Sequence, residues 1–146
     1  MPIPEPTIIR PTELKRIADD KEKAEIREAL ERKVKRDQQH EDLYKEFTER
    51  HLTPDADKRF SEDVRQAAER GEREIQILRF PSEWCSDRGR AINNDEPDWP
   101  QTLTGYAKEC YDAFDKWLRP IGYKIRAQIL DFPGGLPGDV GLFIGW

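Results

Sequence analysis

The residues best suited to chemistry in this sequence surround Cys85, which is followed closely by Asp87 and Arg88. A neighbouring cation can lower the pKa of a thiol, but a nucleophilic cysteine also needs a nearby base. The two histidines, His40 and His51, lie in a distant and highly charged part of the chain. We therefore interpret Cys85 as a structural or surface cysteine, and the sequence predicts no catalytic residue.

Metal and phosphate sites have little support in the sequence. Cys85 and Cys110 lack the paired spacing of zinc ligands, and two histidines eleven residues apart are too far apart to share one metal on a helix. The glycine-rich segment 133–139 resembles a phosphate-binding loop only in composition, because no helix follows and no Lys, Ser or Thr completes it. We expect a structural hairpin loop there, and no metal or cofactor.

The segment 82–100 is the preferred functional surface, because its composition is richer than a plain connection requires. Trp and Arg dominate the energetics of protein–protein interfaces, and both occur here beside acidic and amide side chains. The alternative is that the two tryptophans simply close one end of the core. The candidate binding residues are Trp84, Cys85, Asp87, Arg88, Arg90, Asn93, Asn94 and Trp99.

An internal repeat suggests how this segment is positioned. Residues 76–81 (Gln-Ile-Leu-Arg-Phe-Pro) recur at 128–133 (Gln-Ile-Leu-Asp-Phe-Pro), an offset of 52. Over the ungapped alignment of 76–92 with 128–144, eight of seventeen positions are identical, including Gly89 with Gly141. By symmetry Arg79 would pair with Asp131. The pattern indicates duplication of sequence or of structural role.

Apolar periodicity and turn residues give the elements of each repeat unit. We predict helices near 61–71 and 103–119, the second burying Trp117, and strands near 73–80, 89–93, 123–132 and 139–146. The expected fold is α+β: a two-layer α-β-β-α-β-β sandwich with a four-stranded, mainly antiparallel sheet and a pseudo-twofold axis. Strict alternation would leave both sheet faces partly apolar, so the face without helices would need a cover.

The N-terminal part of the chain differs sharply in composition. Residues 1–11 contain four prolines and read as an extended arm, and a long helix is predicted from Thr12 to about Arg50. Acid-first i,i+4 pairs support that helix, and its apolar residues form two patches, near 14–34 and 43–52, without a sustained heptad. The second patch is expected to dock on the domain, and the first to meet a partner or another copy.

Aromatic residues locate the core. Twelve of the fourteen lie between Phe60 and Trp146, so we predict an arm and helix over 1–52 and a compact domain over 53–146, with repeat units at about 61–93 and 103–146.

Charge and hydropathy limit the kinds of partner that we expect this protein to bind. No long apolar run is present, so no membrane association is expected, and the lack of a signal peptide favours a cytoplasmic protein with free thiols. A net charge of −5 makes nucleic acid an improbable partner, although Arg32, Lys33, Lys35 and Arg36 form a local basic cluster.

The preferred function is a non-catalytic protein-interaction or oligomerisation module that binds through segment 82–100 and the N-terminal helix. The alternative is a small-molecule sensor or enzyme domain with a pocket at segment 82–100. A third reading is nucleic-acid binding through residues 32–36.

Overall fold

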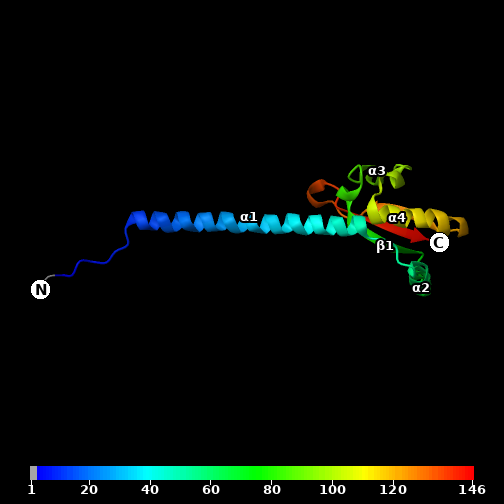
Figure 1. Cartoon of the computed structure of the whole chain (residues 1–146), viewed down its shortest axis with the longest axis horizontal. Helices are drawn as coiled ribbons and strands as arrows, with labels where there is room; N and C mark the ends of the chain where they lie inside the picture. The colour runs from blue at the N-terminus through cyan, green and yellow to red at the C-terminus, as the bar shows by residue number, and fades with distance from the viewer. Residues whose placement is uncertain (1–2) are drawn as a thin grey trace. The chain divides into compact units, whose positions relative to one another are not determined.

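The computed structural model describes residues 3–146, and their contacts divide the chain into two units that meet between Leu43 and Tyr44. The first unit contains an extended segment, which ends at Arg10, and most of helix α1 (Pro11–Glu49). Proline is tolerated at the first helical position because its missing N–H would have no partner there. The helix therefore begins one residue before the Thr12 start that the sequence suggested. The predicted long N-terminal helix is confirmed (Figure 1).

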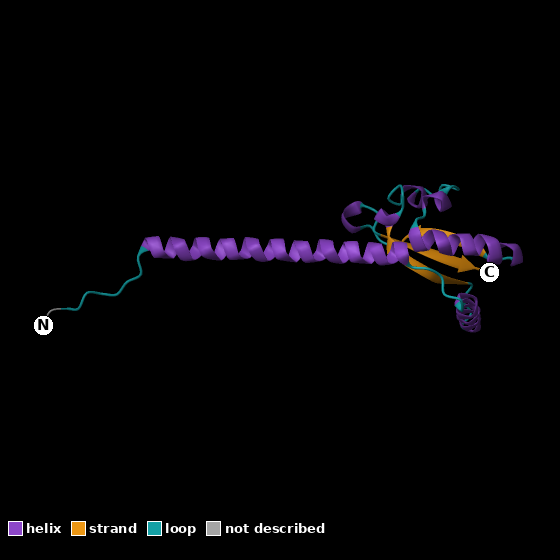
Figure 2. Cartoon of the chain, viewed as in Figure 1, coloured by secondary structure: helices purple, strands orange, loops and turns teal. Residues whose placement is uncertain are grey.

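The second unit contains the remaining helices and all the strands of the described chain. Figure 2 distinguishes the helices, strands and loops by colour. The principal elements are α2 (Ala56–Glu69), β1 (Glu74–Pro81), α3 (Arg90–Asn93), α4 (Gly105–Ala113), β2 (Lys124–Ile129) and β3 (Asp139–Gly145). Short helical turns join them: η1 (Ser82–Trp84), η2 (Trp99–Thr102), η3 (Phe114–Leu118), η4 (Arg119–Ile121) and η5 (Pro133–Gly135).

The sheet of residues 3–146 has three strands in the order β1-β3-β2, and both pairings are antiparallel. The α+β class and the antiparallel sheet are confirmed, but the strand predicted at 89–93 is wrong, because Arg90–Asn93 form α3. Gly89 has a φ of 84°, a left-handed conformation that starts a helix and interrupts an extended chain. Its repeat counterpart, Gly141, lies inside β3. The pseudo-twofold repeat is therefore not confirmed, and the matching Gln-Ile-Leu segments instead flank β3 on opposite sides.

A β-bulge in β1 decides which residues face the core. The pairing with β3 shifts between Gln76 and Leu78, so Ile77 has no direct partner. Without the bulge, Leu78 would lie on the face opposite Ile75. With it, Ile75 and Leu78 lie opposite Ile144 and Leu142, on the same apolar face as Phe80. Leu78 and Phe80 therefore do not share a face with Gln76, as strict alternation predicted.

The open face of the sheet is largely polar, but the half-buried side chains of Leu130 and Phe143 lie on it beside Gly141. Exposed side chains of Gln76, Arg79, Arg126 and Gln128 occupy it. Its one aromatic residue, Phe143, is half-buried, and the Arg126 guanidinium lies 4.1 Å from the centre of its ring. Glu74, on β1, accepts hydrogen bonds from that same guanidinium, which links the two outer strands across β3.

The core packs against the apolar face. Ala107 of α4, Ile92 of α3 and Leu103 belong to one buried cluster with sheet residues such as Val140 and Leu142. Phe47, near the end of α1 and within the second unit, joins the same cluster through Phe80, with ring centroids 5.6 Å apart.

Trp117 is not part of this core, contrary to the sequence prediction. It is 66% exposed, whereas Phe114 is only 1% exposed. The α-helical geometry ends at Ala113, and residues 114–118 form a π-helical turn. A wider turn rotates the following side chains relative to the α-helical stripe that placed Trp117 inward.

Candidate functional site

The segment 82–100 contains two kinds of residue in the structure. Some of the predicted binding residues support the fold, and others reach solvent. Cys85 is buried, Trp84, Asp87 and Trp99 are half-buried, and Arg88, Arg90, Asn93 and Asn94 are exposed.

Trp84 lies at the junction between core and surface. Its ring centroid is 4.6 Å from that of Phe47 and 5.7 Å from that of Tyr44, all within the second unit. The backbone carbonyl of Trp84 accepts a hydrogen bond of 2.5 Å from the Thr104 hydroxyl, which ties η1 to the start of α4. This network holds the indole in place while leaving one part of it accessible.

Cys85 has the environment of a core residue. Only 4% of it is exposed, and burial, followed by the negative charge of Asp87, raises the pKa of its thiol to about 11. Burial also raises the pKa of Cys110 to about 11. Both thiols are therefore protonated at neutral pH, which is the opposite of an activated nucleophile.

Asp87 acts on the backbone of its own segment. Its Oδ1 accepts a hydrogen bond from the N–H of Gly89 at 3.0 Å, and its Oδ2 accepts one from Ala91 at 2.8 Å. A carboxylate at the N-terminus of a helix satisfies N–H groups that have no partner in the first turn. Asp87 thus builds α3 and is not free to contact a ligand with those oxygens.

Trp99 packs against the core through α4. Its ring meets Tyr111 of α4 edge to face, at 5.7 Å and 74°. Its backbone carbonyl accepts a hydrogen bond from Thr102. Trp84 and Trp99 both pack against the core cluster, as the alternative interpretation of the two tryptophans expects.

A surface depression lies where the exposed part of the segment meets the end of α1 within the second unit. We call it the Trp84 depression; it has a volume of about 430 Å³ and is lined by Tyr44, Glu83, Trp84 and Arg88. Arg88 has a φ of 59°, so the backbone turns sharply at this residue. The structure thus combines two aromatic rings with an exposed cation and an exposed anion.

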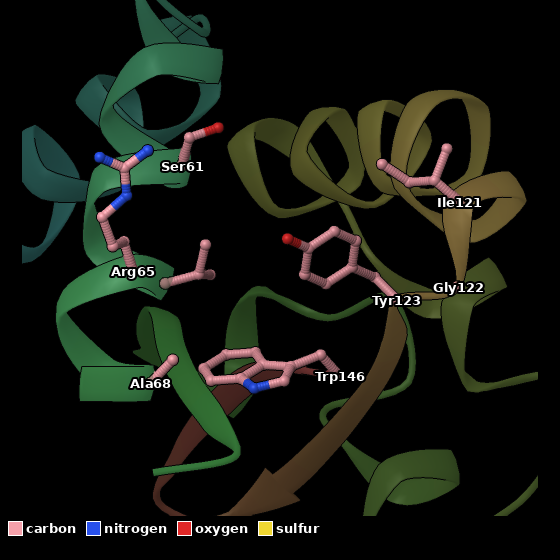
Figure 3. Close-up of a pocket in the computed structure, with 8 residues that line it drawn as sticks. Ser61, Arg65, Ala68, Ile121, Gly122, Tyr123 and Trp146 are labelled. Atoms are coloured by element: carbon pink, nitrogen blue, oxygen red, sulfur yellow. The ribbon is translucent and has the colours of Figure 1, made fainter. Parts of the chain in front are cut away.

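A second hollow was not anticipated from the sequence. It has a volume of about 570 Å³ and lies between α2 and the turn before β2 (Figure 3). Figure 3 shows Tyr123 and Trp146 between the α2 residues Ser61, Arg65 and Ala68 on one side and Ile121 with Gly122 on the other. Tyr123 and Trp146 are 23 residues apart and meet only because β2 and β3 pair, so no local signal could have found this hollow.

The glycine-rich segment 133–139 connects β2 to β3 as the predicted hairpin loop. Gly134 and Gly135 have φ values of 63° and 81°, which glycine adopts without strain. Asp131 accepts a hydrogen bond from the N–H of Asp139 at 2.6 Å. Arg79 pairs with Asp139, at 2.8 Å, and not with Asp131 as the repeat suggested, because β1 lies beside β3.

Among the described residues, 3–146, no three His, Cys, Asp or Glu side chains gather closely enough to hold a metal ion. No helix in the same range combines the length and apolarity needed to cross a membrane.

Comparisons with known proteins give no relationship for this chain. No protein family, no curated protein and no solved structure matches it. The class that its own structure defines is an α+β domain with a three-stranded antiparallel sheet, preceded by a long N-terminal helix.

Proposed function

We propose that this protein is a non-catalytic interaction and oligomerisation module. One binding surface is formed by the Trp84 depression with the exposed residues Arg88, Arg90, Asn93 and Asn94, and α1 supplies a second. The module acts in the cytoplasm, and its partners are proteins, since its net charge of −5 disfavours polyanions.

The observation that carries the proposal is the juxtaposition of aromatic rings and an arginine at the Trp84 depression. Trp84 is held by Phe47 and Tyr44, so binding would not have to order it. A preorganised aromatic anchor with a charged rim is the composition of an interface hot spot. Glu83 and Arg88 would orient a partner side chain that carries both an apolar body and a polar end.

The test substitutes the two exposed arginines at the edge of the Trp84 depression, which we call the rim, and leaves the packed residues unchanged. In Arg88→Ser/Arg90→Ser, both altered residues are exposed, and Trp84 and Cys85 keep their packing. Arg73→Ser/Lys124→Ser is the matched control, because it removes two exposed cations elsewhere in the second unit. We expect equal thermal stability for both variants and loss of specific protein partners, measured by quantitative affinity capture, only for the rim variant. Identical partners for wild type and rim variant would overturn the proposal.

A small-molecule ligand in the same depression is the second candidate function. Its volume of about 430 Å³ lies in the range of small-ligand sites. A ligand found by thermal-shift screening would favour this candidate if Arg88→Ser abolished the shift and Arg73→Ser did not.

A further inference from the structure

The segment before α1, residues 3–10, has the features of an extended ligand peptide. Pro4 and Pro6 fix their own φ at about −65°, and a proline also restricts the residue before it, so residues 3–6 are held extended by local sterics. The three isoleucines of the segment are 91%, 74% and 46% exposed. A chain that is already extended loses little conformational entropy on binding, and proline-rich peptides use this property when they bind aromatic grooves.

The period of an extended proline-rich chain sorts the side chains of segment 3–10. Polyproline II geometry has about three residues per turn, which places Ile3, Pro6 and Ile9 along one edge. The charged residues of the segment are Glu5, in its first half, and Arg10, at its end. The segment therefore combines an apolar edge with an acidic end and a basic end.

The Trp84 depression is complementary to this segment. Its aromatic surface consists of Tyr44 and Trp84, whose rings are inclined at 55° with centroids 5.7 Å apart. Aromatic surfaces of this kind accept proline rings and neighbouring apolar side chains. The charged residues that line the depression are Glu83 and Arg88, and both are exposed. The depression thus offers one charge of each sign to a segment that also carries one of each.

These charges select one direction of binding. In the first direction the acidic end of the segment lies beside Arg88 and the basic end beside Glu83, so both contacts are attractive. In the opposite direction the acidic end meets Glu83 and the basic end meets Arg88, so both contacts are repulsive. Repulsion between like charges excludes wrong arrangements more effectively than attraction adds affinity.

The reach of the segment determines whose depression it can enter. Eight residues, 3–10, span at most about 29 Å when fully extended. The helical residues of the first unit, 11–43, rise about 50 Å at about 1.5 Å per residue. The segment therefore cannot extend along α1 as far as Tyr44 of its own chain. Its binding site must belong to another copy.

We propose that segment 3–10 of one copy binds in the Trp84 depression of a second copy, with its acidic end at Arg88 and its basic end at Glu83. This rests on the proposed function, in which the depression is an interaction surface, and it names the occupant. Solvent-exposed ion pairs and a short apolar edge give weak association, so we expect a dissociation constant of roughly tens of micromolar.

The first experiment measures association of the full chain by sedimentation velocity over a range of concentrations. We expect the average sedimentation coefficient to rise with concentration. Pro6→Ser/Ile9→Ser should weaken association by about fivefold or more, because it removes two apolar side chains from the proposed contact and the restriction that Pro6 places on the backbone. Both residues precede α1, so the circular dichroism and thermal unfolding of the variant should match those of the wild type.

Charge reversal tests the same contact from both sides. Glu5→Arg and Arg88→Glu should each weaken association by about fivefold or more, because each replaces an attraction with a repulsion. The combined variant Glu5→Arg/Arg88→Glu should restore association. Glu22→Arg and Arg73→Glu are the matched controls, because they reverse exposed charges elsewhere in the two units and should leave association unchanged.

The second experiment determines direction by disulfide trapping between two variant chains that are mixed. A disulfide requires Cα atoms within about 7 Å of each other, so it reports close approach. We expect Arg10→Cys chains to cross-link with Glu83→Cys chains and to cross-link little with Arg88→Cys chains. The unmodified chain is the control for Cys85 and Cys110.

Three results would each overturn the proposal: a monomer at every concentration, association that Pro6→Ser/Ile9→Ser leaves unchanged, or preferential cross-linking of Arg10→Cys with Arg88→Cys. The affinity capture with the rim variant is scored on partners other than this chain. A rim variant that loses those partners while the chain stays monomeric would leave the proposed function standing and remove only this contact.

Discussion

Phe114 and Trp117 show that burial at single positions depends on the local helix type. Phe114 is 1% exposed and packs beside Tyr111, with ring centroids 6.2 Å apart and ring planes tilted by 42°. Trp117, three residues later, is 66% exposed, although both lie on the apolar stripe of the sequence. Both residues lie in the π-helical turn, whose wider spacing turns Phe114 toward the core and Trp117 toward solvent.

These two residues give a matched prediction of stability. Phe114→Ala should lower the free energy of unfolding by about 3–5 kcal/mol, because it leaves a cavity in the core. Trp117→Ala should cost less than about 1 kcal/mol, because its side chain is mostly in water. Denaturant unfolding followed by circular dichroism measures both, and equal costs would contradict the observed π-helical register.

The cysteines give a prediction of reactivity. Burial holds the pKa of both thiols at about 11, compared with an ordinary value of 9.0, so less thiolate is present at pH 8 than in an unfolded chain. We expect a thiol-specific reagent at pH 8 to react at least tenfold more slowly with the native protein than with the same protein in denaturant. If mass spectrometry showed that Cys85 reacts rapidly in the native protein, the interpretation of Cys85 as an activated nucleophile would be supported instead.

At the scale of elements, α3 depends on a single carboxylate. The Asp87→Ala substitution removes both hydrogen bonds to the Gly89 and Ala91 N–H groups. We expect a loss of about 1–2 kcal/mol, typical of a helix cap. Asp98→Ala is the control, because Asp98 precedes η2 without a side-chain capping bond and should change stability by about 0.5 kcal/mol or less. Urea denaturation of the two variants compares these costs.

Glu109 connects α4 to the segment after α1. Its carboxylate accepts a hydrogen bond from the N–H of Leu52 at 3.0 Å and contacts His51 at 2.9 Å. The Leu52 hydrogen bond, followed by that from His51, lowers the pKa of Glu109 below its ordinary value of 4.5. These contacts favour the ionised carboxylate in the folded protein.

This lowered pKa predicts how stability depends on pH. The stabilisation is present above the unfolded pKa and is lost as the pH falls through the folded pKa. The difference in unfolding free energy between wild type and Glu109→Gln should therefore be largest above about pH 5 and should shrink in more acidic buffer. Thermal or urea denaturation at several pH values measures it, and a difference that grows on acidification would contradict the assignment.

At the scale of the molecule, the core of the second unit includes residues from the end of α1. Phe47 is buried among Phe80 and Trp84, so the helix end is part of the folded unit. The boundary between the two units lies between Leu43 and Tyr44.

Two truncations test this boundary. Residues 41–146 retain Phe47 and should unfold cooperatively, whereas residues 53–146 lose it and should be less stable by about 3–5 kcal/mol. Circular dichroism during thermal and urea denaturation measures both. Equal stability of the two fragments would show that Phe47 does not contribute to the core.

The sequence alone determined the elements whose causes are local. Residues 11–49 contain no glycine and no proline after the first position, and their acid-first i,i+4 pairs support a helix without tertiary contacts. The strands around 76 and 128 follow from apolar and β-branched composition, and the loop at 133–139 follows from its glycines and prolines.

Only the tertiary structure decided which way the side chains of these elements face. A bulge at Ile77 and a π-helical turn at 114–118 each shift the register by about one residue, enough to exchange the sheet faces of β1 and to expose Trp117. Residues 90–93 align with part of β3 in the predicted repeat, but Asp87 and the left-handed Gly89 start a helix there. The structure divides the sequence-predicted site: Trp84 and Arg88 line one depression, Cys85 and Trp99 pack with the core, and Asp87 bonds the backbone of its own segment.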